Sequence, residues 1–505
     1  PPFATARYPA LGPSLLAAAC ERDGIRCSVT YANVMLAARM GLERYEHIAD
    51  SSSVSAAGER LFAAAAFGTC PLPDGYEDLA VTLDEFVYDV TQQIVRGGAK
   101  IIGFSSSFQQ NSAAVAIARA LKSAAPDRIT LFGGANADAP MGEALADVAG
   151  CFDVVVSGEA DELFTELCRK LLAGRVMPRV ICGLPVQRLD DLPVPRYDDY
   201  FTAIAAFAAA PALPASLPFE SSRGCWWGQK KHCTFCGLNA GGMAYRRKSG
   251  ERLIGEIEQL VTRYGTATLH AADNILPLDL TGEVLPWLAA RQPRLDLFYE
   301  VKANVRPAML DLFVRAGINS IQPGIESLAD RVLQRMDKGV SAAQNIALLR
   351  DCASRQIDVN WNLLVDVPGD EADDYAAMSA LVPSLEHLQP PSGCTPVLID
   401  RYSPYFTKPE AFGITDVRPL PVYASIYPVS ADLSRLAYHF RGTFSTGGRS
   451  EAACALADAV DRWKSRWSDP QCPALMLVEL ESGAAAIVDS RESRYGAWTL
   501  LTSEQ

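Results

Sequence analysis

Three cysteines within twelve residues are the strongest chemical feature of the sequence. Cys225, Cys233 and Cys236 have the spacing C-x7-C-x2-C. Three thiolates can bind three irons of a 4Fe–4S cube and leave the fourth iron open to a substrate, whereas a cube held by four cysteines mainly transfers electrons. The spacing therefore favours an iron–sulfur cluster with one open iron.

A structural zinc site is the alternative for these cysteines. Structural zinc takes four ligands in a tetrahedron, and the fourth would be His232 or a distant residue. Because His232 is bonded directly to Cys233, the two side chains reach one ion only with difficulty. The chain contains no second C-x2-C pair, which most zinc sites of this type require.

The elements around the cysteines predict a partial (β/α)6 barrel over 216–400. Residues 215–220 are predicted to form a strand, so the cysteines follow a strand end, where α/β barrels place their chemistry. Five further strands, each with a polar exit, are predicted at 266–274, 297–304, 320–327, 358–368 and 394–400. The polar residues at these exits would form a ring that faces the cysteines: Asp273, Asn274, Lys302, Asn304, Gln322, Glu326, Asn360 and Asn362.

The amino-terminal part, 1–185, alternates short apolar runs with helical patterns and predicts a parallel, doubly wound (Rossmann-like) α/β sheet. Strands are expected at 25–31, 99–105, 128–134 and 152–159. Such sheets bind ligands at the carboxyl ends of their strands. The residues there, all small or polar except Phe108, suit a large flat ligand: Ser105, Ser106, Ser107, Phe108, Gln109, Gln110, Gly133, Gly134, Ala135, Asn136, Gly158 and Glu159.

Neither of the two common nucleotide-binding signatures is present. G-x-G-x-x-G and G-x-x-x-x-G-K-[ST] are both absent, so no local motif supports a dinucleotide or a nucleoside triphosphate.

A proline-containing linker is expected at 186–215 and a small α+β substrate or capping domain at 401–505. In the latter, helices are predicted at 431–440 and 453–467, and a strand pair at 474–480 and 485–489. Arg401, Tyr402 and Tyr423 could line a substrate cleft. Ordinary aromatic packing in a capping domain explains them equally well.

Composition excludes several functional classes. The 505 residues include 46 basic and 59 acidic side chains, a net charge of −13 without a long Lys/Arg cluster, which argues against nucleic acid. The longest alanine-rich stretch contains Pro211 and Pro214 and is not a membrane span. No signal peptide is visible, and the other ten cysteines are scattered singly. We therefore expect a cytoplasmic protein with no membrane partner.

Several motifs together resemble one enzyme family. Residues 224–239, Gly-Cys-Trp-Trp-Gly-Gln-Lys-Lys-His-Cys-Thr-Phe-Cys-Gly-Leu-Asn, resemble the cluster loop of the cobalamin-binding radical SAM enzymes that mature ribosomally made peptides (RiPPs). Most other radical SAM proteins have C-x3-C-x2-C. Further similar segments are Tyr-Arg-Arg-Lys-Ser at 245–249, Asp-Asn-Ile-Leu-Pro at 273–277, Arg-Tyr-Ser-Pro-Tyr-Phe at 401–406 and Val-Val-Val-Ser-Gly-Glu at 154–159.

The resemblance implies three cofactors. Cys225, Cys233 and Cys236 would bind the 4Fe–4S cluster, and S-adenosylmethionine (SAM) would bind its open iron. The residues expected to contact SAM are Phe235, Asp273, Lys302, Gln322, Glu326, Ser327 and Asn362.

Cobalamin would lie on the strand ends of the amino-terminal domain, as the resemblance implies. The motif D-x-H-x-x-G is absent, and His47 is the only histidine before residue 186. Cobalamin is therefore expected to lack a histidine ligand, with its lower face covered by the loop 105–110.

The implied activity is C-methylation of an unactivated sp3 carbon in a precursor peptide, through methylcobalamin and a 5′-deoxyadenosyl radical. The partners would be the precursor peptide, contacted by Arg401, Tyr402 and Tyr423, and an electron donor such as flavodoxin or ferredoxin. Two alternatives stay open: a cobalamin radical enzyme that epimerises or cyclises its substrate, and a zinc-stabilised binding protein without enzymatic activity.

Overall fold

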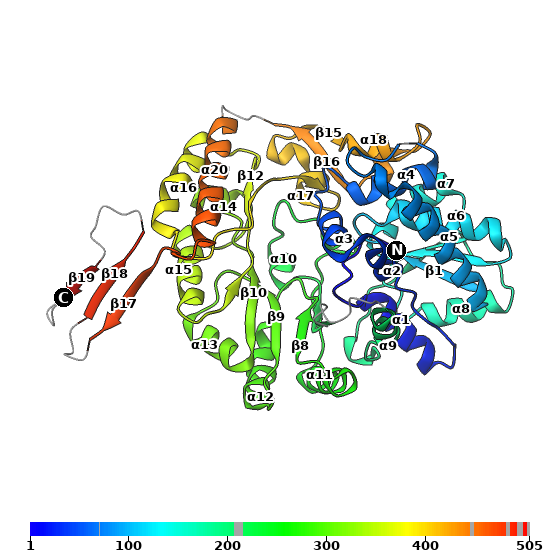
Figure 1. Cartoon of the computed structure of the whole chain (residues 1–505), viewed down its shortest axis with the longest axis horizontal. Coiled ribbons are helices and arrows are strands. Elements are labelled where there is room, and N and C mark those ends of the chain that lie inside the picture. Colours follow the sequence, from blue (N-terminus) through cyan, green and yellow to red (C-terminus); the bar gives the residue numbers. More distant parts are fainter. Residues whose placement is uncertain (70, 207–215, 445–448, 481–484, 492–497, 502–505) are drawn as a thin grey trace.

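Two parallel sheets organise the computed structural model (Figure 1). The structure describes residues 1–69, 71–206, 216–444, 449–480, 485–491 and 498–501. The amino-terminal sheet and its helices lie at one end of the molecule, the barrel strands lie in the middle, and the last strands project from the other end.

The first sheet contains four parallel strands in the order β1-β2-β3-β4. Helices alternate with these strands, as predicted: β1 (Ile101–Ser105), α6 (Asn111–Ala124), β2 (Ile129–Gly133), α7 (Met141–Ala149), β3 (Val154–Gly158), α8 (Phe164–Leu172) and β4 (Val180–Gly183). Since the described strands follow one another in chain order, without the reversal of a doubly wound sheet, the carboxyl ends of β1, β2 and β3 lie side by side.

Five helices precede this sheet, and the strand predicted at 25–31 does not form. The helices are α1 (Leu11–Arg22), α2 (Ala32–Met40), α3 (Leu42–Ala49), α4 (Ala57–Phe67) and α5 (Ala80–Gly97). The backbone of 25–31 is instead bound by side chains of a later segment. The N–H of Val29 donates to Asp199 at 2.8 Å, and Arg196 donates to the carbonyl of Cys27 at 2.8 Å. These bonds replace those of a strand ladder.

Helix α6 begins next to the predicted ligand edge and is capped by a distant carboxylate. Its N-cap residue is Gln110, whose side chain makes no capping hydrogen bond. Buried Glu59, on α4, accepts hydrogen bonds from the backbone N–H of Asn111 at 2.7 Å and of Ser112 at 2.8 Å. A carboxylate at a helix N-terminus satisfies free N–H groups and is favoured by the helix dipole. Glu59 thereby fixes the loop that follows β1.

The segment predicted as a linker is partly helical. The 3-10 turn η3 (Leu189–Asp191) and helix α9 (Asp198–Ala205) lie within it, and Tyr197 and Tyr200 are fully buried. Residues 207–215, with Pro211 and Pro214, lie outside the described residues.

The second sheet confirms the predicted barrel strands. Its order is β11-β10-β9-β8-β5, all parallel, and β12 and β13 continue it as a parallel pair. A parallel bridge between Glu326 and Leu363 joins the two parts. The strands are β5 (Leu217–Phe219), β8 (Thr268–Ala271), β9 (Asp296–Val301), β10 (Ile318–Pro323), β11 (Asp358–Val359), β12 (Leu363–Val365) and β13 (Cys394–Pro396).

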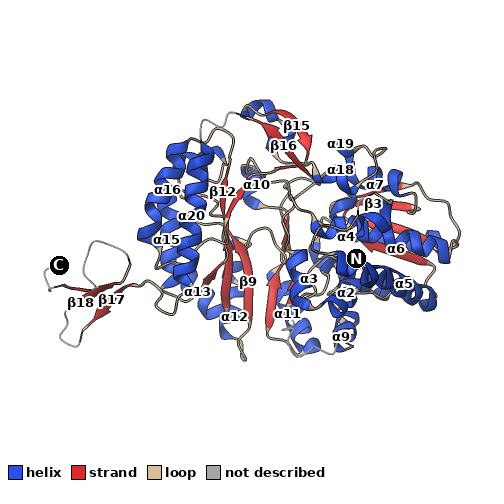
Figure 2. Ribbon diagram, turned by 45° about the horizontal axis from the view of Figure 1, so that its top comes forward, coloured by secondary structure: helices blue, strands red, loops and turns tan. Residues whose placement is uncertain are grey.

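Helices pack around these strands and enclose the largest apolar core. They are α11 (Gly250–Tyr264), α12 (Val284–Ala290), α13 (Pro307–Ala316), α14 (Asp330–Arg335), α15 (Ala342–Ala353) and α16 (Ala372–Leu385). The later helix α20 (Arg449–Trp467), which confirms the predicted helix at 453–467, packs beside α16 (Figure 2).

The carboxyl-terminal part is split between two small antiparallel sheets. One contains β14 (Ile399–Asp400), β16 (His439–Thr443) and β15 (Thr415–Pro419), and the other contains β17 (Leu475–Glu479), β18 (Ala485–Asp489) and β19 (Trp498–Leu501). The helix predicted at 431–440 is wrong. Only α19 (Leu433–Leu436) forms, because Phe440 pairs with Ile399 and Pro419 in the first of these sheets.

No helix in the described part of the chain is both long enough and apolar enough to cross a membrane.

Candidate functional site

The loop with the three cysteines is held at its base by a two-stranded ribbon. β6 (Ser222–Arg223) pairs with β7 (Arg246–Arg247), and the short helix α10 (Trp226–Lys230) begins directly after Cys225. The Sγ of Cys225 accepts a hydrogen bond from the N–H of Gly228 at 3.3 Å. The loop therefore has a defined fold of its own.

The second half of the loop is closed by local hydrogen bonds. The N–H of Cys236 donates to the carbonyl of Cys233 at 3.1 Å. The Nε2 of His232 lies 2.8 Å from the carbonyl oxygen of Cys236. The imidazole is therefore bound to the backbone of the loop, and the zinc alternative would have to break this bond to use Nε2 as a ligand.

The three thiols interact electrostatically in a partly buried environment. Burial raises the pKa of Cys233 and raises that of Cys236 to about 12, while Lys338 acts in the opposite direction on both. A cluster would therefore have to displace thiol protons when it binds. Among the described residues, no three His, Cys, Asp or Glu side chains are grouped to hold a single metal ion. A cube separates its ligands more widely than one ion does, so the donor set of three thiols fits a 4Fe–4S cluster.

Two lysines lie beside the cysteine loop. The Nζ of Lys302 is 3.7 Å from the ring centroid of Trp227, and burial together with Lys338 lowers the pKa of Lys302 to about 8. The Nζ of Lys338 forms an ion pair with Glu326 at 3.2 Å and lies 5.6 Å from the ring of Phe235. These groups could hold the carboxylate and amino group of SAM.

The structure thus brings together three of the residues predicted to contact SAM: Phe235, Lys302 and Glu326. Lys338 completes the group and was missed, because it follows a helix and ends no strand. Gln322 is exposed on β10, and the side-chain amide of Asn362 donates to Thr395 at 2.8 Å.

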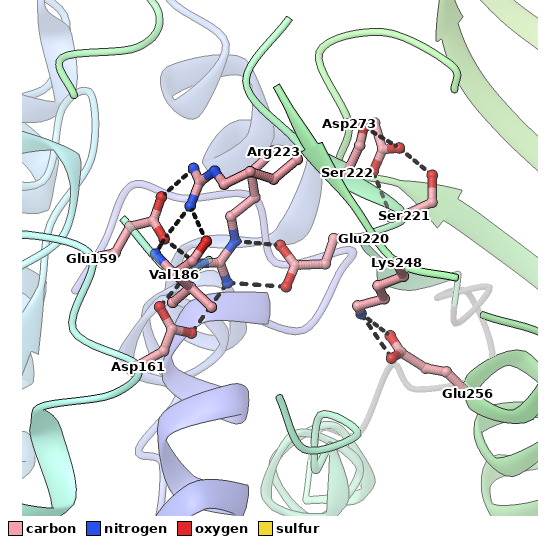
Figure 3. A network of polar contacts seen from close by, with 11 residues as sticks. Glu159, Asp161, Val186, Glu220, Ser221, Ser222, Arg223, Lys248, Glu256 and Asp273 are labelled. Atoms are coloured by element: carbon pink, nitrogen blue, oxygen red, sulfur yellow. Dashed lines mark hydrogen bonds and ion pairs between the residues drawn. The ribbon is translucent and has the colours of Figure 1, made fainter. Parts of the chain in front are cut away.

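Two other predicted SAM contacts face into the protein. Asp273 is only 1% exposed and accepts hydrogen bonds from the N–H of Ser221 at 2.7 Å and from the Oγ of Ser222 at 2.9 Å. Ser327 is fully buried, and its Oγ accepts from the N–H of Ala329 at 3.2 Å. Asp273 therefore fixes the chain entering the cysteine loop (Figure 3), and neither side chain is placed to touch a ligand directly.

The buried Asp273 carboxyl predicts a specific pH dependence of stability. Burial raises its pKa to about 6, against the hydrogen bonds from Ser221 and Ser222. Between pH 4 and pH 6 the folded chain retains a proton that the unfolded chain releases, so this group's contribution to stability falls as pH rises, by up to about 1.4 kcal/mol per pH unit. Asp273→Asn should remove this contribution.

The measurement is the free energy of unfolding in urea of both cofactor-free proteins at several pH values from 4 to 7. The difference between them should change across this window. Parallel pH profiles would contradict the assignment.

A cavity of about 730 Å³ lies along the inner face of the barrel. Its lining includes His270, Phe298, Glu300, Gln322 and Asn360. The ring centroids of His270 and Phe298 are stacked 4.2 Å apart. The pKa of Glu300 is raised to about 7, mainly by burial and secondly by the nearby carboxylate of Glu326. A cavity with an aromatic wall and a few polar groups suits a small organic group.

The residues predicted to bind cobalamin divide into two groups. One group is buried and holds the loop after β1: Ser106, Gln109, Gln110 and Asn136. The Asn136 amide donates to Ser106 Oγ and to the carbonyl of Phe108, each at 3.0 Å. Ser105, Ser107 and Gly133 are partly exposed beside this loop.

The second group is exposed at the edge of the sheet and consists of Phe108, Gly134, Ala135 and Gly158. Phe108 is 76% exposed and has a φ of 45°. A Cβ on Gly134 would lie 2.5 Å from the carbonyl oxygen of Ser106, so only glycine fits there, and its backbone is exposed. A bare backbone edge of this kind admits a large flat ligand, which fits the corrin ring of cobalamin.

Glu159, by contrast, is engaged by protein groups (Figure 3). Its carboxylate binds Arg223 at 3.0 Å and Arg246 at 2.6 Å, and it accepts a hydrogen bond from the N–H of Val186 at 2.8 Å. The prediction that Glu159 binds cobalamin is therefore not supported by its surroundings.

The predicted substrate residues are also engaged within the fold. Arg401 is 5% exposed, donates to the carbonyl of Ala437 at 2.7 Å and lies over the rings of Phe406 and Phe440, 5.1 and 5.0 Å from their centroids. The hydroxyl of Tyr423 accepts from two backbone N–H groups at 3.2 Å. These contacts hold both side chains within the fold and give no support to substrate contact by Arg401, whereas Tyr423 is partly exposed. Tyr402 remains partly exposed and donates to the carbonyl of Ala139 at 3.0 Å.

Comparison with known proteins agrees with this geometry. Residues 219–382, which include β8 to β12, match the model of the radical SAM superfamily. A relative described as an uncharacterised methyltransferase (PH0819) of Pyrococcus horikoshii is 24% identical over 249 residues, which are 45% of this chain and 52% of the relative. The match therefore spans about half of that protein.

Two solved structures share the fold. The radical SAM methyltransferase TsrM of Kitasatospora setae, solved with tryptophan and a SAM analogue, has a TM-score of 0.57 at 15% identity over 90% of this chain and 86% of its own. The cobalamin-dependent radical SAM enzyme OxsB, with aqua-cobalamin and SAM, has a TM-score of 0.56 at 15% identity over 81% of this chain and 64% of its own. The amino-terminal α/β domain and the barrel are thus arranged as in cobalamin-dependent radical SAM enzymes.

Proposed function

We propose that the chain is a cobalamin-dependent radical SAM C-methyltransferase that methylates an unactivated sp3 carbon of a residue in a ribosomally synthesised precursor peptide. The observation that carries the proposal is that one chain combines two features. The cysteine loop follows β5 of the barrel, and the backbone is exposed at the carboxyl edge of the amino-terminal sheet. The matched domain and the methyltransferase relative support a radical SAM methyltransferase. The proposal of a peptide substrate rests on the resemblance of the cysteine loop to that of the peptide-maturing radical SAM enzymes.

The overall reaction balances without a general base at the carbon. Two SAM molecules, two electrons and one C–H bond give S-adenosylhomocysteine, methionine, 5′-deoxyadenosine and one C–CH3 bond. When bound, the cluster and SAM supply the hydrogen-abstracting radical, and cobalamin supplies the methyl group. The electrons would come from a donor such as flavodoxin or ferredoxin. The residues of the chain bind and orient the cofactors and the substrate, and they exclude water from the site.

The three thiols would hold the cluster, and the pair of Glu326 and Lys338 would contact SAM beside it. The exposed backbone at Gly134, Ala135 and Gly158 would support the corrin ring. The apolar ring of Phe108 would cover its lower face, so that no histidine binds the cobalt. The electron paramagnetic resonance spectrum of protein-bound cob(II)alamin should then lack the splitting of an axial nitrogen.

The experiment is an anaerobic incubation of reconstituted protein with cobalamin, a strong reductant, SAM and the precursor peptide encoded beside its gene. Equal amounts of 5′-deoxyadenosine and S-adenosylhomocysteine, with one methyl group gained by the peptide, are expected. 5′-Deoxyadenosine without methylation would favour epimerisation or cyclisation instead. Protein that binds one zinc, and neither iron nor cobalt, would contradict the enzymatic proposal.

A further inference from the structure

Arg223 lies two residues before Cys225 and reaches from the barrel to the amino-terminal domain. It is on β6, at the base of the cysteine loop, and its guanidinium contacts Glu220 of its own segment and Glu159 and Asp161 of the domain containing β1 to β4 (Figure 3). One side chain thus joins the two parts of the proposed site.

All five N–H donors of Arg223 have a carboxylate acceptor. Nε and Nη2 donate to Glu220 at 2.8 and 2.9 Å, Nη1 and Nη2 donate to Asp161 at 2.9 and 3.1 Å, and Nη1 also donates to Glu159 at 3.0 Å. Paired bonds of this kind fix the plane of the guanidinium as well as its distance. The geometry therefore restrains rotation of the barrel relative to the amino-terminal domain.

A second arginine from the same ribbon strengthens this contact. Arg246 pairs with Arg223 across the β6–β7 ribbon and donates to Glu159 at 2.6 and 3.0 Å and to the carbonyl of Val186 at 2.6 Å. The five charged side chains are between 7% and 24% exposed. Partial burial reduces screening by water and salt, so these contacts are stronger than surface pairs.

The network ends next to both proposed cofactor sites. Glu159 directly follows Gly158, which is exposed at the sheet edge, and Cys225 follows Arg223 after one glycine. Gly158 is itself fixed, since its N–H donates to Asp138 at 2.8 Å. A displacement at one end would therefore be transmitted to the other through few rotatable bonds.

We propose that Arg223, together with Arg246, is a positioning residue that sets the separation between the cysteine loop and the ligand-binding edge of the amino-terminal sheet. Its consequence for catalysis rests on the proposed function: the substrate carbon must be reached by the radical from one side and by the methyl donor from the other. When the separation is wrong, 5′-deoxyadenosine still forms, but the substrate radical takes an electron from the reductant and a proton from water instead of the methyl group.

The test uses Asp161→Asn, which removes one charge and preserves shape. Substituting Arg223 itself would leave the partly buried carboxylates of Glu220 and Asp161 without their charged partner and could prevent folding. Asp161→Glu keeps the charge. Asp78→Asn is the matched control, because Asp78 accepts two hydrogen bonds from Arg44, at 2.6 and 2.7 Å, in an exposed pair away from the interface.

The first readout is hydrogen–deuterium exchange of the cofactor-free chain. Asp161→Asn should accelerate exchange about fivefold or more in 220–247, on the opposite side of the interface, whereas Asp161→Glu and Asp78→Asn should not. Faster exchange confined to the neighbours of residue 161 would overturn the proposal. This readout requires no catalytic activity.

The second readout is the amount of methylated peptide per 5′-deoxyadenosine. Asp161→Asn should lower this ratio about fivefold or more, because small misplacements carry large kinetic costs, and Asp161→Glu should restore most of it. An unchanged ratio would overturn the positioning role. If the unaltered chain makes no methylated peptide, the proposed function fails, and the exchange experiment still decides whether Arg223 couples the two parts.

Discussion

Replacing Cys225, Cys233 and Cys236 together by alanine is expected to abolish iron binding and to reduce 5′-deoxyadenosine formation by more than about 1,000-fold. Reductive cleavage of SAM requires the cluster, and no other thiol group of the sequence has a comparable spacing. Iron content after anaerobic reconstitution and 5′-deoxyadenosine by chromatography measure the two effects. The iron–sulfur absorbance should disappear with the iron.

Cys182→Ala provides the control, because Cys182 is an exposed, free thiol on β4. It should keep full iron content and full activity. Iron retained in the triple variant, or 5′-deoxyadenosine still formed by it, would refute the assignment of the cluster ligands.

Gly134→Ala is expected to abolish cobalamin binding while the iron content stays normal. Gly134 has a φ of 90° and a ψ of −179°, a conformation that is almost restricted to glycine and costs about 1–3 kcal/mol for other residues. The added Cβ would also lie 2.5 and 2.7 Å from the backbone O and N of Ser106. The loop after β1 must shift to relieve this contact, which disturbs the edge on which cobalamin is proposed to lie.

Gly103→Ala is the matched control, because Gly103 lies on β1, outside the predicted cobalamin-binding residues, and a Cβ there would have no atom within 4 Å. Cobalt content and the absorbance of the bound cofactor distinguish the two variants. Equal cobalamin binding by both would place the cofactor elsewhere. Loss of iron as well as cobalt in Gly134→Ala would indicate general unfolding rather than a local effect.

The sequence predicted the parts of the fold in which local pattern and burial agree. The apolar runs at 99–105, 128–134 and 152–159 became β1 to β3, because parallel strands buried on both faces need continuous hydrophobic residues. The barrel strands could be predicted for the same reason. Residues 25–31 alternate apolar and polar side chains, which also predicts a strand. Arg196 and Asp199 bind their backbone instead, and the local sequence pattern does not reveal partners so far along the chain.

The candidate site was predictable where spacing alone defines the chemistry. The role of the three cysteines can be predicted from their spacing in the sequence, whereas the role of a charged residue depends on which groups the fold places beside it. Arg401 and Glu159 look available in the sequence, yet each is fully engaged by groups that are distant along the chain. Lys338 joins the site because the turn after α14 passes beside the cysteine loop, which only the fold reveals.

The most direct test of the central claim is the mass of the precursor peptide after anaerobic turnover with SAM whose methyl group carries three deuterium atoms. The account predicts a peptide that has exchanged one C–H hydrogen for one trideuterated methyl group, formed in equal amount with 5′-deoxyadenosine and with S-adenosylhomocysteine. A peptide without the deuterated methyl group, in protein loaded with iron and cobalt and producing 5′-deoxyadenosine, would contradict it.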